Sequence, residues 1–231
     1  SLGIIILLSR LGFDITVIRF MPNNDSRSVF YSCLWITTIT TILIGSIYVT
    51  FINFLSPEIS FISNYSFYFL IVAIFNSIML ISANALLALR KADLRFVQNI
   101  IMGGRLLLLS PLAFLGSLGI FYSVGLAYII ATAFALIIIK SNIAPTFKID
   151  WNFVRKTLNF SLMNYLASIF QYVPTLAMPI IIINIIGPED AAFYYIAFAI
   201  GNLVLIIPDA MSYSFFVEGS YGINLRKGAK K

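Results

Sequence analysis

The chain alternates between long apolar stretches and short polar connections. A helix that crosses a hydrocarbon core of about 30 Å needs roughly 20 mostly apolar residues, and it pairs its backbone polar groups within the segment. Seven stretches meet this requirement: residues 2–22, 29–55, 67–89, 97–115, 119–139, 158–186 and 191–217. The pattern therefore predicts an all-α fold, a polytopic transmembrane helix bundle with seven spans.

Composition agrees with a membrane protein and excludes several chemistries. Hydrophobic residues make up 60% of the chain and charged residues 10%, against about 45–50% and about 25% in soluble domains. The chain has no histidine, and its single cysteine, Cys33, cannot build a disulfide within the chain or a multi-cysteine zinc site. The sequence contains no Walker A pattern. We therefore expect a protein that is not an enzyme and that uses no metal or cofactor.

The basic residues predict an orientation. All but two of the 15 Lys and Arg residues lie on alternate connections, whereas the intervening connections, 56–66, 116–118 and 187–190, hold none. Lys and Arg of short loops stay on the cytoplasmic side, so the first span is expected to start outside and the chain to end in the cytoplasm. This placement accounts for the net charge of +6, and no nucleic-acid partner is expected.

The other two basic residues, Arg10 and Arg105, lie inside predicted spans. A charge there usually faces a bundle interior or a water-filled cavity. Asp14 follows Arg10 at the i, i+4 spacing that places both on one helix face, so Arg10 either forms a structural ion pair or binds an anionic substrate. Arg105 has no such neighbour. It either binds a phosphate, which the guanidinium fork suits, or snorkels towards the headgroups along Gly103 and Gly104.

Three further positions in the spans are candidates for function. Asp209 follows Pro208, and a carboxylate beside a helix breaker can bind a coupling cation or proton; its alternative role is to pair with a neighbouring helix. Asp14 is the second ion-coupling candidate. Pro174 and Pro179 lie in one predicted span, where they would bend the helix and form a gate or hinge.

Residues 140–157 separate five spans from two and are predicted to lie on the cytoplasmic surface as a linker between two lobes. An offset of 195 residues places Asp14 on Asp209 and Phe20 on Phe215, as in a transporter built from two repeated halves. The apolar pattern is already under way at Ser1, so we expect a fragment of a longer protein.

Three stretches carry a resemblance to a known family. They are Arg10-Leu11-Gly12-Phe13 through Arg19-Phe20-Met21-Pro22, Asn84-Ala85-Leu86-Leu87-Ala88-Leu89-Arg90-Lys91, and Ile207-Pro208 through Ser214-Phe215-Phe216-Val217-Glu218-Gly219-Ser220. In these stretches the chain resembles the Wzx-type polysaccharide flippases of the multidrug/oligosaccharidyl-lipid/polysaccharide exporter superfamily. The resemblance implies two six-helix lobes, in some members with two extra helices. Residues 1–139 would form most of the N-terminal lobe (spans two to six), 140–157 the linker, and 158–231 the start of the C-terminal lobe (spans seven and eight).

The resemblance also implies a function. The protein would move an isoprenoid-diphosphate-linked oligosaccharide across the cytoplasmic membrane by alternating access, for the synthesis of cell-surface polysaccharide. Arg10 and Arg105 would attract the diphosphate. Lipid-linked oligosaccharide and membrane lipid would be the partners, together with other proteins of polysaccharide assembly.

Other functions stay open at this point. A cation-coupled multidrug exporter of the same superfamily would use Asp14 and Asp209, because its substrates need acidic groups in the cavity. A membrane scaffold would pair its charges in a packed interior. An isoprenoid-phosphate transferase would need clustered acidic residues for Mg²⁺, whereas Asp25, Asp93 and Asp150 stand in separate connections.

Overall fold

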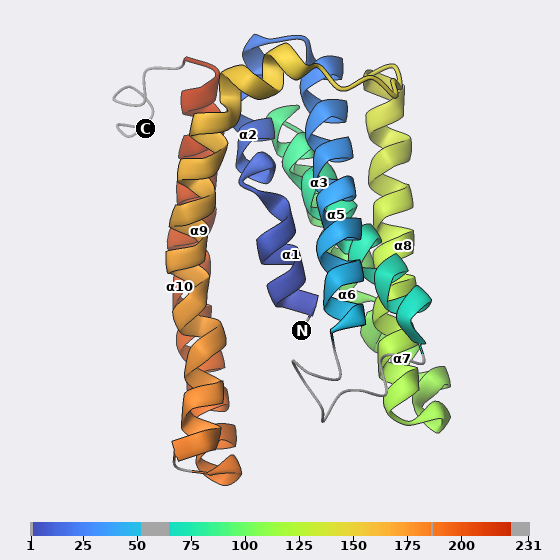
Figure 1. Ribbon diagram of the computed structural model, residues 1–231, viewed down its shortest axis with the longest axis vertical. Coiled ribbons are helices and arrows are strands. Elements are labelled where there is room, and N and C mark those ends of the chain that lie inside the picture. Colours follow the sequence, from blue (N-terminus) through green and yellow to red (C-terminus); the bar gives the residue numbers. More distant parts are fainter. Residues whose placement is uncertain (1, 52–64, 186, 223–231) are drawn as a thin grey trace.

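The computed structural model describes residues 2–51, 65–185 and 187–222, and in these ranges the regular elements are helices, with no strand. Figure 1 shows them as a bundle with a long hairpin of two helices at one side. In chain order the elements are α1 (Leu2–Arg10), α2 (Phe13–Phe20), η1 (Met21–Asn23), α3 (Ser26–Thr50), α5 (Ser66–Ala88), α6 (Ala92–Gly103), α7 (Arg105–Leu112), η3 (Ala113–Leu115), α8 (Ser117–Asn142), α9 (Trp151–Ile185) and α10 (Pro188–Ser220). The predicted all-α class is confirmed.

Four helices of the described residues are long and apolar enough to cross a membrane. They are Ser26–Thr50, Ser66–Ala88, Leu118–Asn142 and Ala192–Ser220, which correspond to four of the seven predicted spans. The protein is therefore a helical protein with the character of a membrane bundle. The described residues supply fewer unbroken candidates than the sequence pattern predicts.

The first predicted span, 2–22, is divided into α1 and α2. Leu11 and Gly12 between them have φ of 48° and 76°, the left-handed region that ends a right-handed helix. A Cβ at Gly12 would overlap the Ser161 carbonyl oxygen of α9. Glycine is thus required twice here, for its backbone conformation and for the close approach of α9.

The predicted span 97–115 is also divided. The α-helix α6 begins earlier, at Ala92, and ends at Gly103, and α7 starts at Arg105 and contains Pro111. Two adjacent glycines are poor helix formers, and a proline inside a helix removes a hydrogen bond. In contrast, α9 runs unbroken over 35 residues and includes the predicted span 158–186 except its last residue, which lies outside the described part.

One end of the bundle, here called the linker end, holds the connection between α8 and α9. Asp150 caps α9 by accepting hydrogen bonds from the backbone N–H groups of Asn152 and Phe153, both at 3.0 Å. The Ser28 hydroxyl of α3 donates to Asp150 at 2.8 Å. The hydrogen bond from the Phe153 N–H, and to a smaller extent the one from the Ser28 hydroxyl, lowers the pKa of Asp150 below its ordinary value. The start of α9 is therefore fixed to the start of α3.

An apolar core of the described residues lies in the same half of the molecule. It joins α2, α3, α5, α8 and the first turns of α9. Its fully buried large side chains include Phe13, Phe30, Ile81 and Ile139. The basic residues Arg19, Arg27, Arg90, Lys91, Lys140 and Lys148 stand near the helix ends at or next to this end. Parts of the predicted loop pattern, residues 52–64 and 223–231, lie outside the described residues.

The hairpin of α9 and α10 touches the rest of the bundle mainly near the linker end. Among the described side chains of these two helices, the buried ones are Phe153, Val154, Thr157, Ser161, Val217 and Ser220. None of the described side chains from 192 to 216 is buried. In Figure 1 the far ends of both helices extend away from the other elements. The hairpin is thus held at one end and bare at the other, within the described chain.

Candidate functional site

The two predicted candidates at the start of the chain form an ion pair. Arg10 Nη1 lies 3.0 Å from Asp14 Oδ2, and the two side chains are 18% and 9% exposed. The Arg10 Nε group also donates to the Ile6 carbonyl at 3.3 Å. Because the break at Leu11 and Gly12 falls between the two residues, this pair bridges the end of α1 and the start of α2. The structural alternative considered for Arg10 is therefore realised in this conformation.

The pair also contacts two other helices. The Asn84 amide of α5 donates to the Asp14 carbonyl oxygen at 2.9 Å, and the Arg10 guanidinium carbon lies 5.7 Å from the centre of the Tyr172 ring of α9. Cations at this distance are attracted by the face of an aromatic ring. Arg10 thus lies between the N-terminal bundle and the hairpin.

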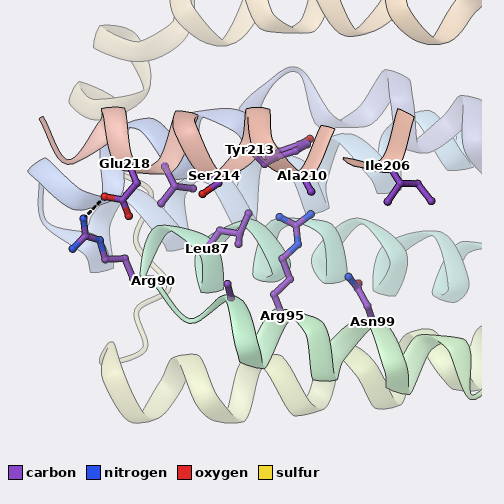
Figure 2. A pocket seen from close by; sticks show the side chains of 11 residues that line it. Leu87, Arg90, Arg95, Asn99, Ile206, Ala210, Tyr213, Ser214 and Glu218 are labelled. Carbon is purple, nitrogen blue, oxygen red and sulfur yellow. Dashed lines mark hydrogen bonds and ion pairs between the residues drawn. The ribbon is translucent and has the colours of Figure 1, made fainter. Parts of the chain in front are cut away.

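A cavity of about 590 Å³, here called the α6–α10 cavity, lies beside α10. It is lined by Leu87, Arg90, Ala92, Arg95, Asn99, Ile206, Ala210, Tyr213, Ser214, Val217 and Glu218. Arg95 and Asn99 project from successive turns of α6, and Tyr213 and Ala210 face them from α10 (Figure 2). The lining combines two cations, a carboxylate, and amide and hydroxyl groups with aliphatic side chains, so it suits a ligand that is itself amphipathic.

Besides Arg90, which is paired with Glu218, this cavity is lined by the cation Arg95. Its guanidinium carbon lies 5.3 Å from the centre of the Tyr213 ring, and the side chain is half-buried. Within the described residues, ion pairs are formed by Arg10 and by Arg90 but not by Arg95. The positive charge of Arg95 is therefore available to an anionic group in the cavity.

A second cavity, here called the α9–α10 cavity, has a volume of about 320 Å³. Its lining is Ile15, Asn164, Gln171, Tyr172, Asp209, Ser212, Tyr213 and Phe216. Tyr213 lines both cavities, and Tyr172 also contacts Arg10. The predicted candidates Arg10, Asp14 and Asp209 are thus brought to the surroundings of these two tyrosines.

Arg105 is placed elsewhere. It begins α7, which packs against α8, and its side chain is exposed. Arg105 lines neither of the two cavities described above. The structure therefore does not bring Arg105 together with Arg10, and its assignment to the substrate stays a prediction. Pro174 and Pro179 lie within α9, but their side chains are outside the described part of the chain.

Sequence reasoning missed Arg95. The loop charge pattern predicts only the side of the membrane on which Arg95 lies. A local signal was present, because Arg95 and Asn99 are four residues apart and share one face of a helix. The facing side of α10 contributes lining residues at helical spacing, namely Ile206, Ala210, Tyr213, Ser214 and Val217.

The chain matches no protein-family model, no curated protein and no solved structure.

Proposed function

We propose that the chain is part of a transporter that moves an isoprenoid-diphosphate-linked oligosaccharide across the cytoplasmic membrane by alternating access. In this proposal the divided pairs α1–α2 and α6–α7 also cross the membrane, as does α9, giving the seven crossings that the apolar pattern predicts. Residues 1–139 belong to one lobe, 158–231 begin the second, and the linker end is cytoplasmic. The protein is then a multi-pass protein of the cell membrane without enzymatic activity.

The observation that carries the proposal is Arg95 in the α6–α10 cavity, a cation that forms no ion pair with the described residues. A diphosphate needs a permanent positive charge, and arginine supplies one with several donors. The sugar needs hydroxyl and amide partners such as Ser214 and Asn99, and an isoprenoid chain tolerates the aliphatic wall formed by Ile206 and its neighbours. One cavity thus offers a surface to each part of this amphipathic substrate.

Arg10 has a narrower role than the sequence resemblance implies. Its guanidinium is paired with Asp14 at 3.0 Å, so its charge is largely neutralised in this conformation. Arg95 replaces it as the primary anion contact in the proposal. In the proposal, Arg10 contacts the substrate only in a conformation that separates it from Asp14. Arg105 stays a proposed contact to the diphosphate, which the experiment below tests.

The experiment is lipid flipping in proteoliposomes. The protein in full length is reconstituted with a fluorescent polyprenyl-diphosphate oligosaccharide, and the rate of appearance in the opposite leaflet is measured. Arg95→Gln is expected to lower the rate about tenfold, the order expected for the loss of one charge-assisted contact. Arg10→Gln and Arg105→Gln test the earlier assignments.

Arg27→Gln is the matched control, because Arg27 is an exposed cation near the linker end and lines neither cavity. Equal rates for Arg95→Gln and Arg27→Gln, with normal insertion of both, would remove Arg95 from the substrate path. A protein in full length that moves no lipid-linked sugar would refute the proposal itself.

A second candidate function rests on the α9–α10 cavity. Asp209 lines it with the amides Asn164 and Gln171 and the Ser212 hydroxyl, a set of oxygen donors that suits a cation. A cation-coupled exporter of organic cations would use this carboxylate. It predicts efflux of a fluorescent organic cation from the same proteoliposomes and loss of that efflux in Asp209→Asn.

A further inference from the structure

At the linker end of the α6–α10 cavity, the last turn of α10 and the turn that joins α5 to α6 are in contact. Arg90 Nη2 lies 2.7 Å from Glu218 Oε2, and the Arg90 guanidinium carbon lies 4.1 Å from the centre of the Tyr221 ring. The Tyr221 hydroxyl donates to the Ala88 carbonyl oxygen. We call Arg90, Glu218 and Tyr221 the latch cluster. Its members come from segments more than a hundred residues apart, so it joins the hairpin to the bundle.

The backbone at Arg90 supports a specific role for its side chain. Arg90 has a φ of 58° and follows the end of α5, where its N–H donates to the Leu87 carbonyl and the Lys91 N–H donates to the Leu86 carbonyl. This pattern of two bonds ends many helices, and the residue in the left-handed conformation is usually glycine. An arginine in this position carries backbone strain, and such strain is often found at functional sites. Glycine would avoid this strain, but it has no side chain that could contact Glu218 and Tyr221 as the Arg90 guanidinium does.

The latch cluster forms one boundary of the cavity. Arg90 and Glu218 both line it, and Figure 2 shows their ion pair at one end of the row of lining side chains, with Arg95, Ala210 and Ile206 lying progressively farther along. A path from the linker end into the cavity therefore passes between Arg90 and Glu218.

The contacts of the cluster are suited to opening and closing. The Arg90 and Glu218 side chains are 45% and 39% exposed, and an ion pair with this exposure contributes little by itself because water and salt screen it. Water also replaces the lost partners when the pair separates. The cluster can thus break without leaving a buried charge behind, unlike the Arg10–Asp14 pair.

We infer that Arg90, Glu218 and Tyr221 form a reversible gate that closes the cytoplasmic end of the α6–α10 cavity. The word cytoplasmic rests on the proposed function, whereas the gate itself rests on the contacts above. The gate is closed in the present structure. Separation of α10 from the α5–α6 turn opens the cavity to the linker side, where a headgroup enters.

Access of a water-soluble thiol reagent tests the gate. The natural cysteine, Cys33, is fully buried, so a membrane-impermeant maleimide reports on an introduced cysteine. Ala210→Cys places a thiol in the cavity, two turns of α10 deeper than Glu218. Labelling is measured in inside-out vesicles that contain the protein in full length, with the parent protein lacking the new cysteine as the blank.

Arg90→Gln and Glu218→Gln, each combined with Ala210→Cys, are expected to raise the labelling rate about fivefold, the shift expected when one exposed ion pair is lost from a two-state equilibrium. The exchanged pair Arg90→Glu/Glu218→Arg should bring the rate back towards that of Ala210→Cys alone. Lys91→Gln is the matched control. Lys91 is the next cation in the same turn, but it donates to Asn142 of α8 at 2.8 Å, and its loss should leave the rate unchanged.

Two results would overturn the gate: rates that do not differ between Glu218→Gln and Lys91→Gln, or an exchanged pair that labels as fast as the single variants. Labelling needs no transport substrate, so the gate and the proposed function can fail separately. If the gate variants label faster while the protein flips no lipid-linked sugar, the gate stands and the proposed substrate falls.

Discussion

The Thr16 and Ser161 side-chain oxygens lie 2.6 Å apart, although 145 residues separate the two positions in the chain. Both hydroxyls are fully buried. The pair joins α2 to α9 close to Gly12, whose lack of a side chain makes room for the Ser161 carbonyl. Small residues at such a contact let two helix backbones approach closely, and hydroxyl pairs then bond across the interface. This contact fixes where the hairpin meets the bundle.

Gly12→Ala should destabilise the protein by about 2 kcal/mol, because the new methyl group meets a backbone oxygen and the residue keeps a positive φ. The thermal unfolding midpoint of the protein in detergent measures this. Gly201→Ala is the control, since Gly201 lies in α10 with no atom within 4 Å of the added Cβ. A Gly12→Ala variant as stable as Gly201→Ala would show that α9 does not pack against this break.

The Thr16 and Ser161 hydroxyls should be energetically coupled. A double-mutant cycle with Thr16→Val and Ser161→Ala is expected to give a coupling of about 0.6 kcal/mol, the average for hydrogen bonds between membrane helices. Unfolding free energies of the parent, the two single variants and the double variant provide it. Strictly additive losses would mean that the two hydroxyls bond only to their own helices.

Asp14→Asn should destabilise the protein by about 3 kcal/mol, because it leaves the Arg10 guanidinium unpaired in a largely buried position. The double variant Arg10→Met/Asp14→Leu should be more stable than Asp14→Asn, since no charge is left without a partner. Unfolding midpoints in detergent compare them. Arg90→Gln is the reference for an exposed pair and should cost less than about 1 kcal/mol; an equal loss in Asp14→Asn would place the Arg10 pair in contact with water.

The cap at Asp150 should make stability depend on pH in the acidic range. The pKa of Asp150 is lowered in the folded chain by the Phe153 N–H and the Ser28 hydroxyl, so the unfolded chain takes up the proton first as the pH falls. The stabilisation is complete above the ordinary carboxyl range and is lost as the pH falls through the folded value, below about pH 4.

Asp150→Asn keeps an oxygen acceptor for the helix start but does not titrate. We therefore expect the unfolding midpoint of the parent to fall relative to that of Asp150→Asn between pH 6 and pH 3. Asp93→Asn removes a carboxylate of α6 and leaves the Asp150 cap intact, so it should follow the parent. If the unfolding midpoints of the parent and of Asp150→Asn change with pH in parallel, Asp150 is not the group that makes stability depend on pH.

Much of the helical architecture follows from local pattern. Apolar length predicted α3, α5, α8 and α10, because a helix in lipid pairs its backbone groups internally and needs no information from the rest of the chain. The Arg10–Asp14 pair followed from spacing alone. Both features depend on neighbours within a few residues.

The remainder depends on distant contacts. The break at Leu11 and Gly12 interrupts a stretch whose composition is apolar, and the Ser161 carbonyl that lies against it belongs to another helix. The position of Arg95 in a cavity likewise requires α10, more than a hundred residues later, to pass α6. A count of loop charges gives Arg95 a side of the membrane but cannot reveal which helix faces it.

The one-sided attachment of the hairpin gives it the mechanics of a lever. The contact at Ser161 is the fulcrum, and the arm from there to Ile185 extends about 36 Å at 1.5 Å per residue. A rotation of about 10° at the fulcrum moves the tip of such an arm by about 6 Å, while the atoms beside Gly12 shift by far less. A small rotation near the linker end is thereby converted into a wide excursion at the opposite face of the molecule, where the described side chains of α10 are not buried.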